Sequence, residues 1–483
     1  MSTKQKNTEN GIYDARVLGK PKMLILGIQH MFAMFGATVL VPMITGLDTA
    51  TTLLMAGLGT LFFHLVTKGK VPAFLGSSFA FLGGYAAVKS FAPEGTDQLK
   101  MLPYACIGVA CAGLVYLILA LVIKLVGVNR VMKFFPPVVT GPIIMAIGLS
   151  LAPSALNNCS SSWPLAIVAL AIVIAFNIWG KGMTKIIPII LGVIGAYIVA
   201  LIFGNLIGVE SMKINFDSIS SIITNIGNGH IYGEDALICL PIFNDKTIFG
   251  GVDWSNSDLI ISSIIAIVPI ALATMMEHIG DICAIGSTCG RNFIKDPGLH
   301  RTLIGDGFAT TFASVFGGPA NTTYGENTGV LALSKVYDPK VIRIAAYFAI
   351  CISFFPIVSA FISTIPTAVI GGISFVLYGM ISAIGVRNVV ESKVDFTKSR
   401  NLIIAAVILV CALGIKYSSG MGADLVAGID GAVKFQVFGI DISLSALAVA
   451  SIVGIVLNAI LPGKDYDFNE ENPPKETGAN LEI

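Results

Sequence analysis

Long apolar runs follow one another along almost the whole chain, and they limit what it can fold into more than any other feature. A helix needs about 20 mainly apolar residues to cross a bilayer, and fewer where it is broken or buried in protein. Fourteen such runs begin near Met23, Ala50, Pro72, Met101, Val131, Trp163, Lys185, Leu259, Gly298, Gly318, Val341, Thr367, Asn401 and Ile440. The sequence therefore predicts an all-α polytopic membrane protein with fourteen transmembrane spans.

The composition argues against several other classes of protein. Only 12% of the 483 residues are Asp, Glu, Lys or Arg, about half the share usual in soluble proteins. The net charge of +1 indicates no strongly basic surface of the kind that binds nucleic acid. The 8 cysteines form no CxxC pair, so we expect neither a disulfide framework nor a metal site. The chain lacks a phosphate-binding loop for ATP, so an ion gradient across the membrane would have to drive any transport. We expect no cofactor.

The placement of the basic residues orients the spans, because Lys and Arg gather in the cytoplasmic loops of membrane proteins. With both termini inside, the outer loops hold six of the 30 basic residues, namely Lys89, Lys100, Lys213, Lys246, Lys416 and Lys434. Residues 1–22 are polar and lack the apolar core of a signal peptide. We therefore expect a multi-pass protein of the cell membrane, with cytoplasmic tails at 1–22 and 462–483 and an extracytoplasmic loop at 209–258.

Two pairs of short motifs recur seven spans apart. Pro72 opens the third span and Pro319 opens the tenth, each followed by Ala. Pro136 in the fifth span and Pro366 in the twelfth are each followed five residues later by Gly. An odd number of spans per repeat places the two halves in opposite orientations, which is the inverted-repeat architecture of secondary transporters. The alternative is chance recurrence of Pro and Gly in Gly-rich helices.

The tenth span is too polar and too rich in Gly to face lipid as a helix. Non-helical backbone at membrane depth survives only inside protein or against a cavity. For residues 317–329 we expect an extended stretch followed by a half-helix that begins near Gly325, with a matching break at residues 75–80 in the third span. Two half-helix N-termini that face each other near the midplane would bind carbonyl or anionic oxygens. An external loop is the alternative.

Few ionisable side chains lie within the apolar runs. Glu277 lies near the middle of residues 259–290, and Asp281, four residues later, shares its helix face. Glu326 lies in the broken tenth span. A carboxylate at the centre of a bilayer normally faces a cavity and marks a path for substrate or protons. Two other buried candidates are Asp306 in the ninth span and His30 in the first.

Each of these groups has a structural alternative, in which a buried carboxyl or imidazole ties two helices together. The structural alternative is least favoured for Glu277 and Glu326. It is favoured for His278, whose side chain points about 100° away from that of Glu277 on the same helix.

These residues resemble the nucleobase/ascorbate transporter family, in particular its bacterial uracil and xanthine permease branch. The similarity extends from about Lys20 to Leu461, and the block Asn-Thr-Thr-Tyr-Gly-Glu-Asn at residues 321–327 is its most specific part. The other matching stretches are residues 27–42, 72–81, 277–281, 296–301 and 390–395.

The resemblance implies fourteen spans in two inverted sevens, divided into two domains. Spans 1–4 (23–130) and 8–11 (259–366) would form a core domain. Spans 5–7 (131–208) and 12–14 (367–461) would form a gate domain, with spans 5 and 12 as the surface that moves against the core. The resemblance implies that Glu277, Glu326, Phe79 and Gly325 bind the substrate, and we add Ser78 and Tyr324 beside them. From their place in the apolar runs, Asp281, His30 and Asp306 are the candidates for proton coupling.

The function predicted from these features is proton-coupled uptake of a nucleobase by alternating access. The partners would be uracil, also xanthine, a proton and membrane lipid, with a homodimer left open. Glu326 matches the uracil carriers of the family, whereas Asp281 and Asp306 match its xanthine carriers, so a purine-selective permease is the alternative. An anion carrier on a similar fold is a weaker alternative, because two carboxylates would repel an anion. A membrane enzyme is also weaker, because its catalytic cluster would lie near an interface, whereas the acids here lie at the midplane. A passive channel is a third alternative, which counterflow of labelled uracil would distinguish from a carrier.

Overall fold

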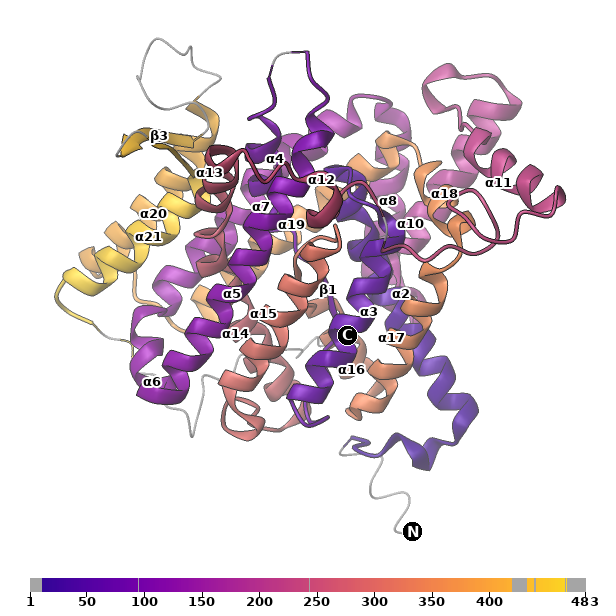
Figure 1. The fold of residues 1–483 in the computed structure, drawn as a ribbon. Helices are drawn as coiled ribbons and strands as arrows, with labels where there is room; N and C mark the ends of the chain where they lie inside the picture. Colours follow the sequence, from indigo (N-terminus) through magenta and orange to yellow (C-terminus); the bar gives the residue numbers. More distant parts are fainter. Residues whose placement is uncertain are drawn as a thin grey trace, which may run out of the picture.

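The structure is a computed structural model that describes residues 11–93, 95–242, 244–418, 432–437, 440–464 and 466. The side chains of Met183, Ile186, Glu326 and residues 434–443 lie outside that description. Helices dominate the described part of the chain, and they run mostly alongside one another (Figure 1).

The longer helices follow the predicted apolar runs, except for the helix at residues 217–227, which lies in the predicted loop 209–258. They are α2 (Lys20–Thr45), α3 (Thr49–Val66), α5 (Leu102–Val126), α7 (Pro137–Cys159), α8 (Trp163–Trp179), α10 (Pro188–Ala200), α11 (Asp217–Gly227), α13 (Ser257–Ile267), α14 (Ile270–Cys289), α15 (Leu299–Val315), α16 (Gly325–Ser334), α17 (Pro339–Ser353), α19 (Thr367–Glu391), α20 (Ser399–Tyr417) and α21 (Ala446–Ile460).

Shorter elements join or interrupt them. The short helices are η1 (Ala15–Leu18), α4 (Leu82–Lys89), η2 (Gln98–Met101), α6 (Val128–Val131), η3 (Met132–Phe134), α9 (Met183–Ile186), η4 (Leu201–Leu206), η5 (Glu210–Met212), α12 (Ile248–Gly251), η6 (Ile294–Gly298) and α18 (Pro356–Ser363). The strands are β1 (Leu75–Ser77), β2 (Asn321–Thr323), β3 (Ala432–Val437) and β4 (Ile440–Ser445).

Within the described residues, eight helices or joined helices are long and apolar enough to cross a membrane. A ninth is added if α17 and α18, bent by 86°, count as one span. The chain is therefore a mainly helical membrane protein, and the count of fourteen crossings stays a prediction.

Two predicted span starts are wrong in detail. The last span was expected near Ile440, but residues there form β4, which pairs antiparallel with β3, and α21 begins only at Ala446. Apolar residues alternate with polar ones through residues 433–437 and 440–445, a period-2 pattern that favours a hairpin. The fifth span was expected near Val131, but α7 begins at Pro137, where Pro is favoured because the first helical turn needs no N–H donor.

Side chains and glycines set the ends of several helices. Gly46 adopts a left-handed conformation (φ 86°) and ends α2, because other residues pay a steric cost there. Asp48 begins α3 by accepting a hydrogen bond from the backbone N–H of Thr51 at 2.6 Å. Asp338 begins α17 in the same way, with the N–H of Lys340 at 3.0 Å. The turns between spans are thus encoded locally.

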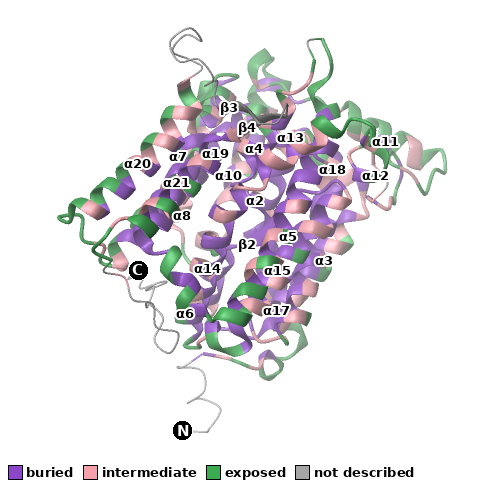
Figure 2. Ribbon diagram, turned by 60° about the vertical axis from the view of Figure 1, so that its left-hand side comes forward, coloured by how far each residue is buried: buried purple, intermediate pink, exposed green. Residues whose placement is uncertain are grey.

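The expected breaks in the third and tenth spans are present as a pair of short strands. β1 and β2 are antiparallel, with Leu75 opposite Thr323 and Ser77 opposite Asn321. After β2, α16 begins at Gly325, as predicted, whereas after β1 the helix α4 begins only at Leu82. Every residue of both strands is buried. Figure 2 shows the buried residues concentrated in the middle of the molecule, around β2, which contacts α14 and α15.

The helices form two groups around this strand pair. In the first group α3 packs against α15 and α17, α15 packs against α5, and α2 packs against α17. In the second group α7 packs against α19 and α20, and α8 packs against α10 and α19. Helix α14 belongs to the first group through α16 and α5, and it also contacts α7 and α21.

Glycines bring α7 and α19 unusually close together. A Cβ added to Gly385 of α19 would lie 2.5 Å from the backbone nitrogen of Met145, and one added to Gly371 would lie 2.5 Å from that of Cys159. The hydroxyl of Ser382 donates to the carbonyl of Met145 at 3.0 Å. Gly141 and Gly371 likewise face the partner helix within the second group. Movement of spans 5 and 12 against the core stays a prediction.

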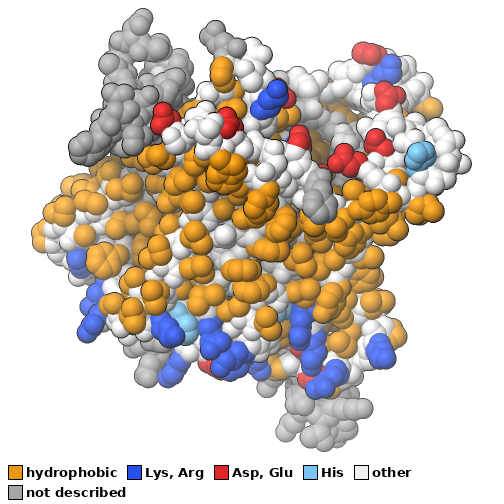
Figure 3. Space-filling model, in the orientation of Figure 1, with side chains coloured by type: hydrophobic (Ala, Val, Ile, Leu, Met, Phe, Trp, Pro, Cys, Tyr) orange, Lys and Arg blue, Asp and Glu red, His pale blue; other side chains and the backbone are white. Residues whose placement is uncertain are grey.

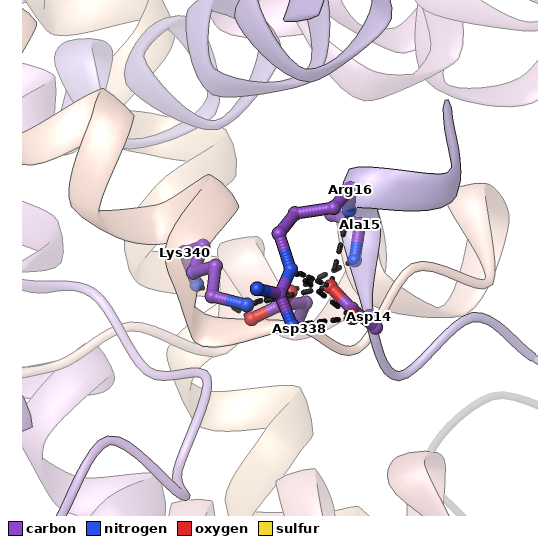
Figure 4. A network of polar contacts seen from close by, with 5 residues as sticks. All are labelled: Asp14, Ala15, Arg16, Asp338 and Lys340. Carbon is purple, nitrogen blue, oxygen red and sulfur yellow. Dashed lines mark hydrogen bonds and ion pairs between the residues drawn. The ribbon is translucent and has the colours of Figure 1, made fainter. Parts of the chain in front are cut away.

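A short N-terminal strap, residues 11–18, is held against the first helix group (Figure 4). The N–H of Ala15 donates to a carboxylate oxygen of Asp338 at 2.8 Å, and Lys340 lies 3.3 Å from Asp14. The Arg16 guanidinium beside Asp14 holds the pKa of that carboxyl below its ordinary value, so the ion pair persists as the solution becomes moderately acidic. Nothing in the polar composition of residues 1–22 predicted this docking.

The exposed side chains are banded. In the view of Figure 3 hydrophobic side chains cover the middle of the molecule, Lys and Arg gather along the lower edge, and Asp and Glu lie along the upper edge. An apolar belt between two polar rims is the pattern expected of a protein embedded in a bilayer.

We predict that Gly385→Leu destabilises the protein by about 1–3 kcal/mol, the usual cost of overpacking. The added side chain would press on the α7 backbone at Met145. Thermal unfolding of the purified protein measures the effect. Gly379→Leu is the matched control, because Gly379 lies on the same helix with nothing within 4 Å of an added Cβ. Equal midpoints for the two variants would show that the contact between α7 and α19 is not tight.

Candidate functional site

A cavity of about 430 Å³ lies between the two helix groups, within the range of about 300–1,000 Å³ typical of ligand sites. One wall comes from α14, β2, α16 and Phe79, and it carries Glu277 and Asp281. The opposite wall comes from α7, α8, α10 and α19, and its lining includes Ile144, Val173, Ile189, Val376, Leu377 and Ile381. A planar ligand could therefore contact apolar side chains on one side and polar groups on the other.

The polar wall is organised by α14. Glu277 and Asp281 lie one helical turn apart, both half-buried and both lining the cavity. The Thr323 hydroxyl donates a hydrogen bond to Asp281 at 2.7 Å. This bond fixes the carboxylate of Asp281 against the end of β2.

The N-terminus of α16 faces the same carboxylate. A Cβ added to Gly325, the first residue of α16, would lie 4.0 Å from Oδ1 of Asp281. The first backbone N–H groups of a helix have no partner within the helix and carry a partial positive charge. Asp281 and the start of α16 therefore place an acceptor and several donors side by side.

Tyr324 lines the cavity but directs its hydroxyl elsewhere. That hydroxyl donates to the carbonyl of Ser77 at 2.9 Å and accepts from Thr38 at 3.2 Å, so it links β1 to α2. Gly76 allows this approach, because a Cβ there would lie 2.6 Å from the Tyr324 ring. The Tyr324 side chain therefore braces the strand pair, and the direct substrate contact expected of it would have to come from its backbone.

The structure brings together some of the predicted residues and separates others. The cavity lining includes Glu277, Asp281, Phe79, Tyr324 and Gly325. The Phe79 ring also meets Tyr378 of α19 edge-on, with centroids 6.0 Å apart, and so joins the two helix groups. The backbone of Glu326 is the second residue of α16, and its side chain lies outside the described residues.

Three predicted residues are not part of the cavity lining. Ser78 is fully buried, and its N–H donates to the carbonyl of Ala320 at 2.8 Å. His30 is fully buried and receives the side-chain amide of Asn327 on its backbone carbonyl at 3.3 Å. Asp306 is fully buried on α15. Their contacts are those of the structural alternative, although a role in proton coupling stays a prediction for His30 and Asp306.

Sequence reasoning missed three charged residues in the lining of the cavity. They are Lys185, Arg387 and Glu391, and the nitrogen Nε of Arg387 lies 3.6 Å from Glu391. The i, i+4 spacing of Arg387 and Glu391 was a readable signal of a helix-surface ion pair. Thr323 was also missed, although it stands in the most specific motif of the chain.

Comparisons with known proteins identify the class of protein. The model of the Permease family matches residues 21–420. The chain belongs to the nucleobase/ascorbate transporter family. It is an integral membrane permease and not an enzyme, as the sequence predicted.

Curated relatives of this permease match it over most of its length. The uracil permease of Bacillus subtilis (strain 168) is 40% identical over 448 residues, which cover 90% of this chain and 91% of the relative. The probable uracil permease of Haemophilus influenzae is 37% identical over 453 residues, which cover 92% and 95% of the two chains.

A solved structure supports the fold. The transmembrane domain of the cyanobacterial bicarbonate transporter BicA matches with a TM-score of 0.55, over 84% of this chain and 97% of that one. The sequence identity of 17% means that the likeness concerns the fold alone.

Within the described residues, no group of three or more His, Cys, Asp or Glu side chains could hold a metal ion.

We predict that Tyr324→Phe lowers the free energy of unfolding by about 0.5–1.5 kcal/mol, the usual net value of one hydrogen bond. Ligand affinity should change less than threefold, because the lost hydroxyl bonds Ser77 and Thr38. Thermal unfolding and equilibrium binding of the purified protein separate the two effects. Tyr347→Phe on the exposed side of α17 is the control. A large loss of affinity without a loss of stability would return the hydroxyl to the binding site.

Proposed function

We propose that this permease carries a neutral nucleobase, uracil in the first place, into the cell together with protons. The observation that carries the proposal is the pair of half-buried carboxylates on α14, of which Asp281 faces the N-terminus of α16 across the polar wall. Relatives described as uracil permeases support the choice of substrate.

The hydrogen-bonding pattern of uracil matches this wall. One edge of the ring presents N–H and C=O groups in alternation. Carboxylates at Glu277 and Glu326 would accept the ring N–H groups, and backbone N–H groups at Phe79 and Gly325 would donate to the carbonyls. The apolar wall of α7 and α19 would cover the faces of the ring. Two carboxylates disfavour the binding of an anion, so the fold shared with a bicarbonate transporter does not imply its substrate.

Transport would proceed by movement of the two helix groups against each other. In this proposal residues 23–130 and 259–366 form the core, residues 131–208 and 367–461 form the gate, and the fourteen spans are two inverted sevens. The antiparallel pairing of β1 with β2, each shortly after a Pro-Ala step, supports the inverted repeat. The position of the cavity between the groups supports alternating access.

The distribution of charge supports cytoplasmic termini. The basic rim lies along the same edge of the molecule as the strap of residues 11–18 (Figures 1 and 3), and basic loops favour the cytoplasm. Two basic residues of the segments expected on the cytoplasmic side, Lys185 and Arg387, are among the lining of the cavity. The cavity would therefore open towards the cytoplasm, the side on which a carried base is released.

Xanthine is a second candidate substrate. Asp281 and Asp306 match the xanthine carriers in the resemblance noted above, and the cavity is large enough for a purine. Uptake of labelled uracil and labelled xanthine into proteoliposomes, with and without a pH gradient, tests both candidates. We expect uracil to accumulate only with an inward proton gradient. Equal accumulation of uracil with and without the pH gradient would refute proton symport. Uptake of xanthine without uptake of uracil would refute uracil as the substrate.

We predict that Glu277→Gln and Glu326→Gln each weaken uracil binding roughly 10- to 150-fold. A hydrogen bond to a charged group contributes about 1.5–3 kcal/mol, and the amide of Gln can present a donor to the ring N–H. Equilibrium binding to the purified protein measures the loss. Glu210→Gln, at the exposed start of η5, is the control. Unchanged affinity in either variant would remove that residue from the site.

We predict that Asp281→Asn separates binding from coupling. The carbonyl of Asn can still accept from Thr323, so base exchange between vesicles and medium should continue. Two carboxyls close together in a poorly solvated cavity hold at least one proton between them, and Asn removes one of the two. Accumulation against a gradient and most of the pH dependence of uptake should therefore be lost. Accumulation of wild-type magnitude in Asp281→Asn vesicles would contradict the assignment.

A further inference from the structure

The N-terminal strap contacts the far ends of the two helices of the polar wall, α14 and α16. The hydroxyl of Tyr13 donates to the carbonyl of Cys289, the last residue of α14, at 2.7 Å. The N–H of Ile12 donates to the carbonyl of Lys335, directly after α16, at 2.7 Å. Two neighbouring residues of the strap therefore bond the ends of both helices.

Further contacts fix Tyr13 between the two helix ends. The guanidinium carbon of Arg291, just beyond α14, lies 4.3 Å from the centroid of the Tyr13 ring, which is a cation–π contact. On the other side the ring centroid of Tyr337 lies 5.4 Å from that of Tyr13, and the N–H of Tyr337 donates to the carbonyl of Ile12 at 2.8 Å. Gly11 permits this approach, because its φ is 93° and an added Cβ would overlap the Tyr337 ring.

The strap is also anchored beyond Tyr13. The N–H of Ala15 donates to the carboxylate of Asp338, at the start of α17, at 2.8 Å (Figure 4). The chain then continues into α2, which bonds α16 where the side-chain amide of Asn327 donates to the carbonyl of His30 at 3.3 Å. The strap is therefore held by its own neighbours and can constrain the helix ends that it contacts.

The helices α14 and α16 are tied together at both ends. At the cavity the Thr323 hydroxyl bonds Asp281 at 2.7 Å, and α16 begins at Gly325. Eight residues lead from Asp281 to Cys289 and ten lead from Gly325 to Lys335, which correspond to roughly 12 and 15 Å of helix. The two helices also contact each other. They therefore run side by side from the cavity to the strap, which closes the far end of the pair.

Helix α16 needs this support more than α14 does. It has 10 residues, against 20 in α14, and isolated helices shorter than about 12–15 residues are marginal. It ends at Lys335, whose φ of 53° is disfavoured for a residue with a Cβ. The strap bonds the carbonyl of that residue. The position of α16, including its first turn in the cavity, therefore depends on the strap.

We propose that Tyr13 is a positioning residue for the binding site, which holds α16 beside α14 through the strap and so sets the affinity for the base. The proposal rests on the function proposed above, because it takes the base to bind between Glu277 and the first turn of α16. With the strap in place, the donors of α16 stay in register with the carboxylates of α14. Without it, α16 can tilt at its far end, and donors and acceptors no longer fit one planar ligand.

The variant Tyr13→Ala tests the proposal in the full chain. Tyr13 is 40% exposed, so its truncation leaves the core intact. We expect uracil binding to the purified protein to weaken about fivefold or more, within the range usual for coupling between separate sites. In proteoliposomes the KM for uracil should rise while kcat stays within about twofold of wild type, because a loss of binding alone raises KM.

Two further variants frame this result. Tyr13→Phe keeps the ring against Arg291 and Tyr337 and should bind uracil more tightly than Tyr13→Ala. Val17→Ala, on the same strap, is the control, because Val17 is 69% exposed, and it should bind uracil as the wild type does. Wild-type affinity in Tyr13→Ala would overturn the proposal. A lower thermal stability without a lower affinity would make the strap a purely structural anchor.

Hydrogen exchange of the backbone amides of residues 325–334, measured without ligand, tests the tie between the strap and α16 by itself. We expect faster exchange in Tyr13→Ala than in the wild type and Val17→Ala. Gly11→Ala keeps Tyr13 but displaces the strap from Tyr337, so it should have the same effect. Exchange at the wild-type rate in both variants would overturn the proposal. A wild type that binds neither uracil nor xanthine, but whose α16 exchanges faster in Tyr13→Ala, would instead refute the proposed function.

Discussion

Every backbone N–H and C=O within a membrane must find a partner in the protein, and the structure of this permease depends on how it meets that requirement where two helices are broken. The strands β1 and β2 satisfy each other, and the chain on either side bonds across the pair, as from Tyr324 to the carbonyl of Phe74 at 3.1 Å. The remaining edges are completed by side chains: Thr60 accepts from the N–H of Leu75, and Thr310 donates to the carbonyl of Asn321. Without these bonds the break in the helices would be too costly to keep.

The break is what makes a site available. An unbroken helix would hide its N–H groups within the membrane, whereas α16 begins at Gly325 beside Asp281. The polar residues around it divide into two kinds. Some line the cavity, as Glu277 does, and others brace the strands from behind, as Tyr324 does through its hydroxyl and Asn321 does through Met55. The bracing residues keep the donors and acceptors of the cavity in place.

The two walls of the cavity have different physical tasks. The polar wall is built on segments that hydrogen-bond one another, so it can hold a fixed pattern of donors and acceptors. The apolar wall is built on α7 and α19, which pack tightly through glycines and so can move as a unit. A rigid recognition surface against a rigid apolar surface suits a carrier, because the contact between them can form and break without unfolding either.

The sequence by itself determined the class of this protein, most of its helices, and the presence of a break before Gly325, because hydropathy, Pro and Gly act locally along the chain. It also singled out Glu277 and Asp281, since a carboxylate in an apolar run is rare and costly. Only the tertiary structure decided which polar residues face the cavity and which brace the fold. Ser78, His30 and Asp306 resembled site residues in the sequence, but their neighbours come from distant segments, as His278 does for Asp306. The partner of a buried polar group is set by packing between helices, and no local pattern records it.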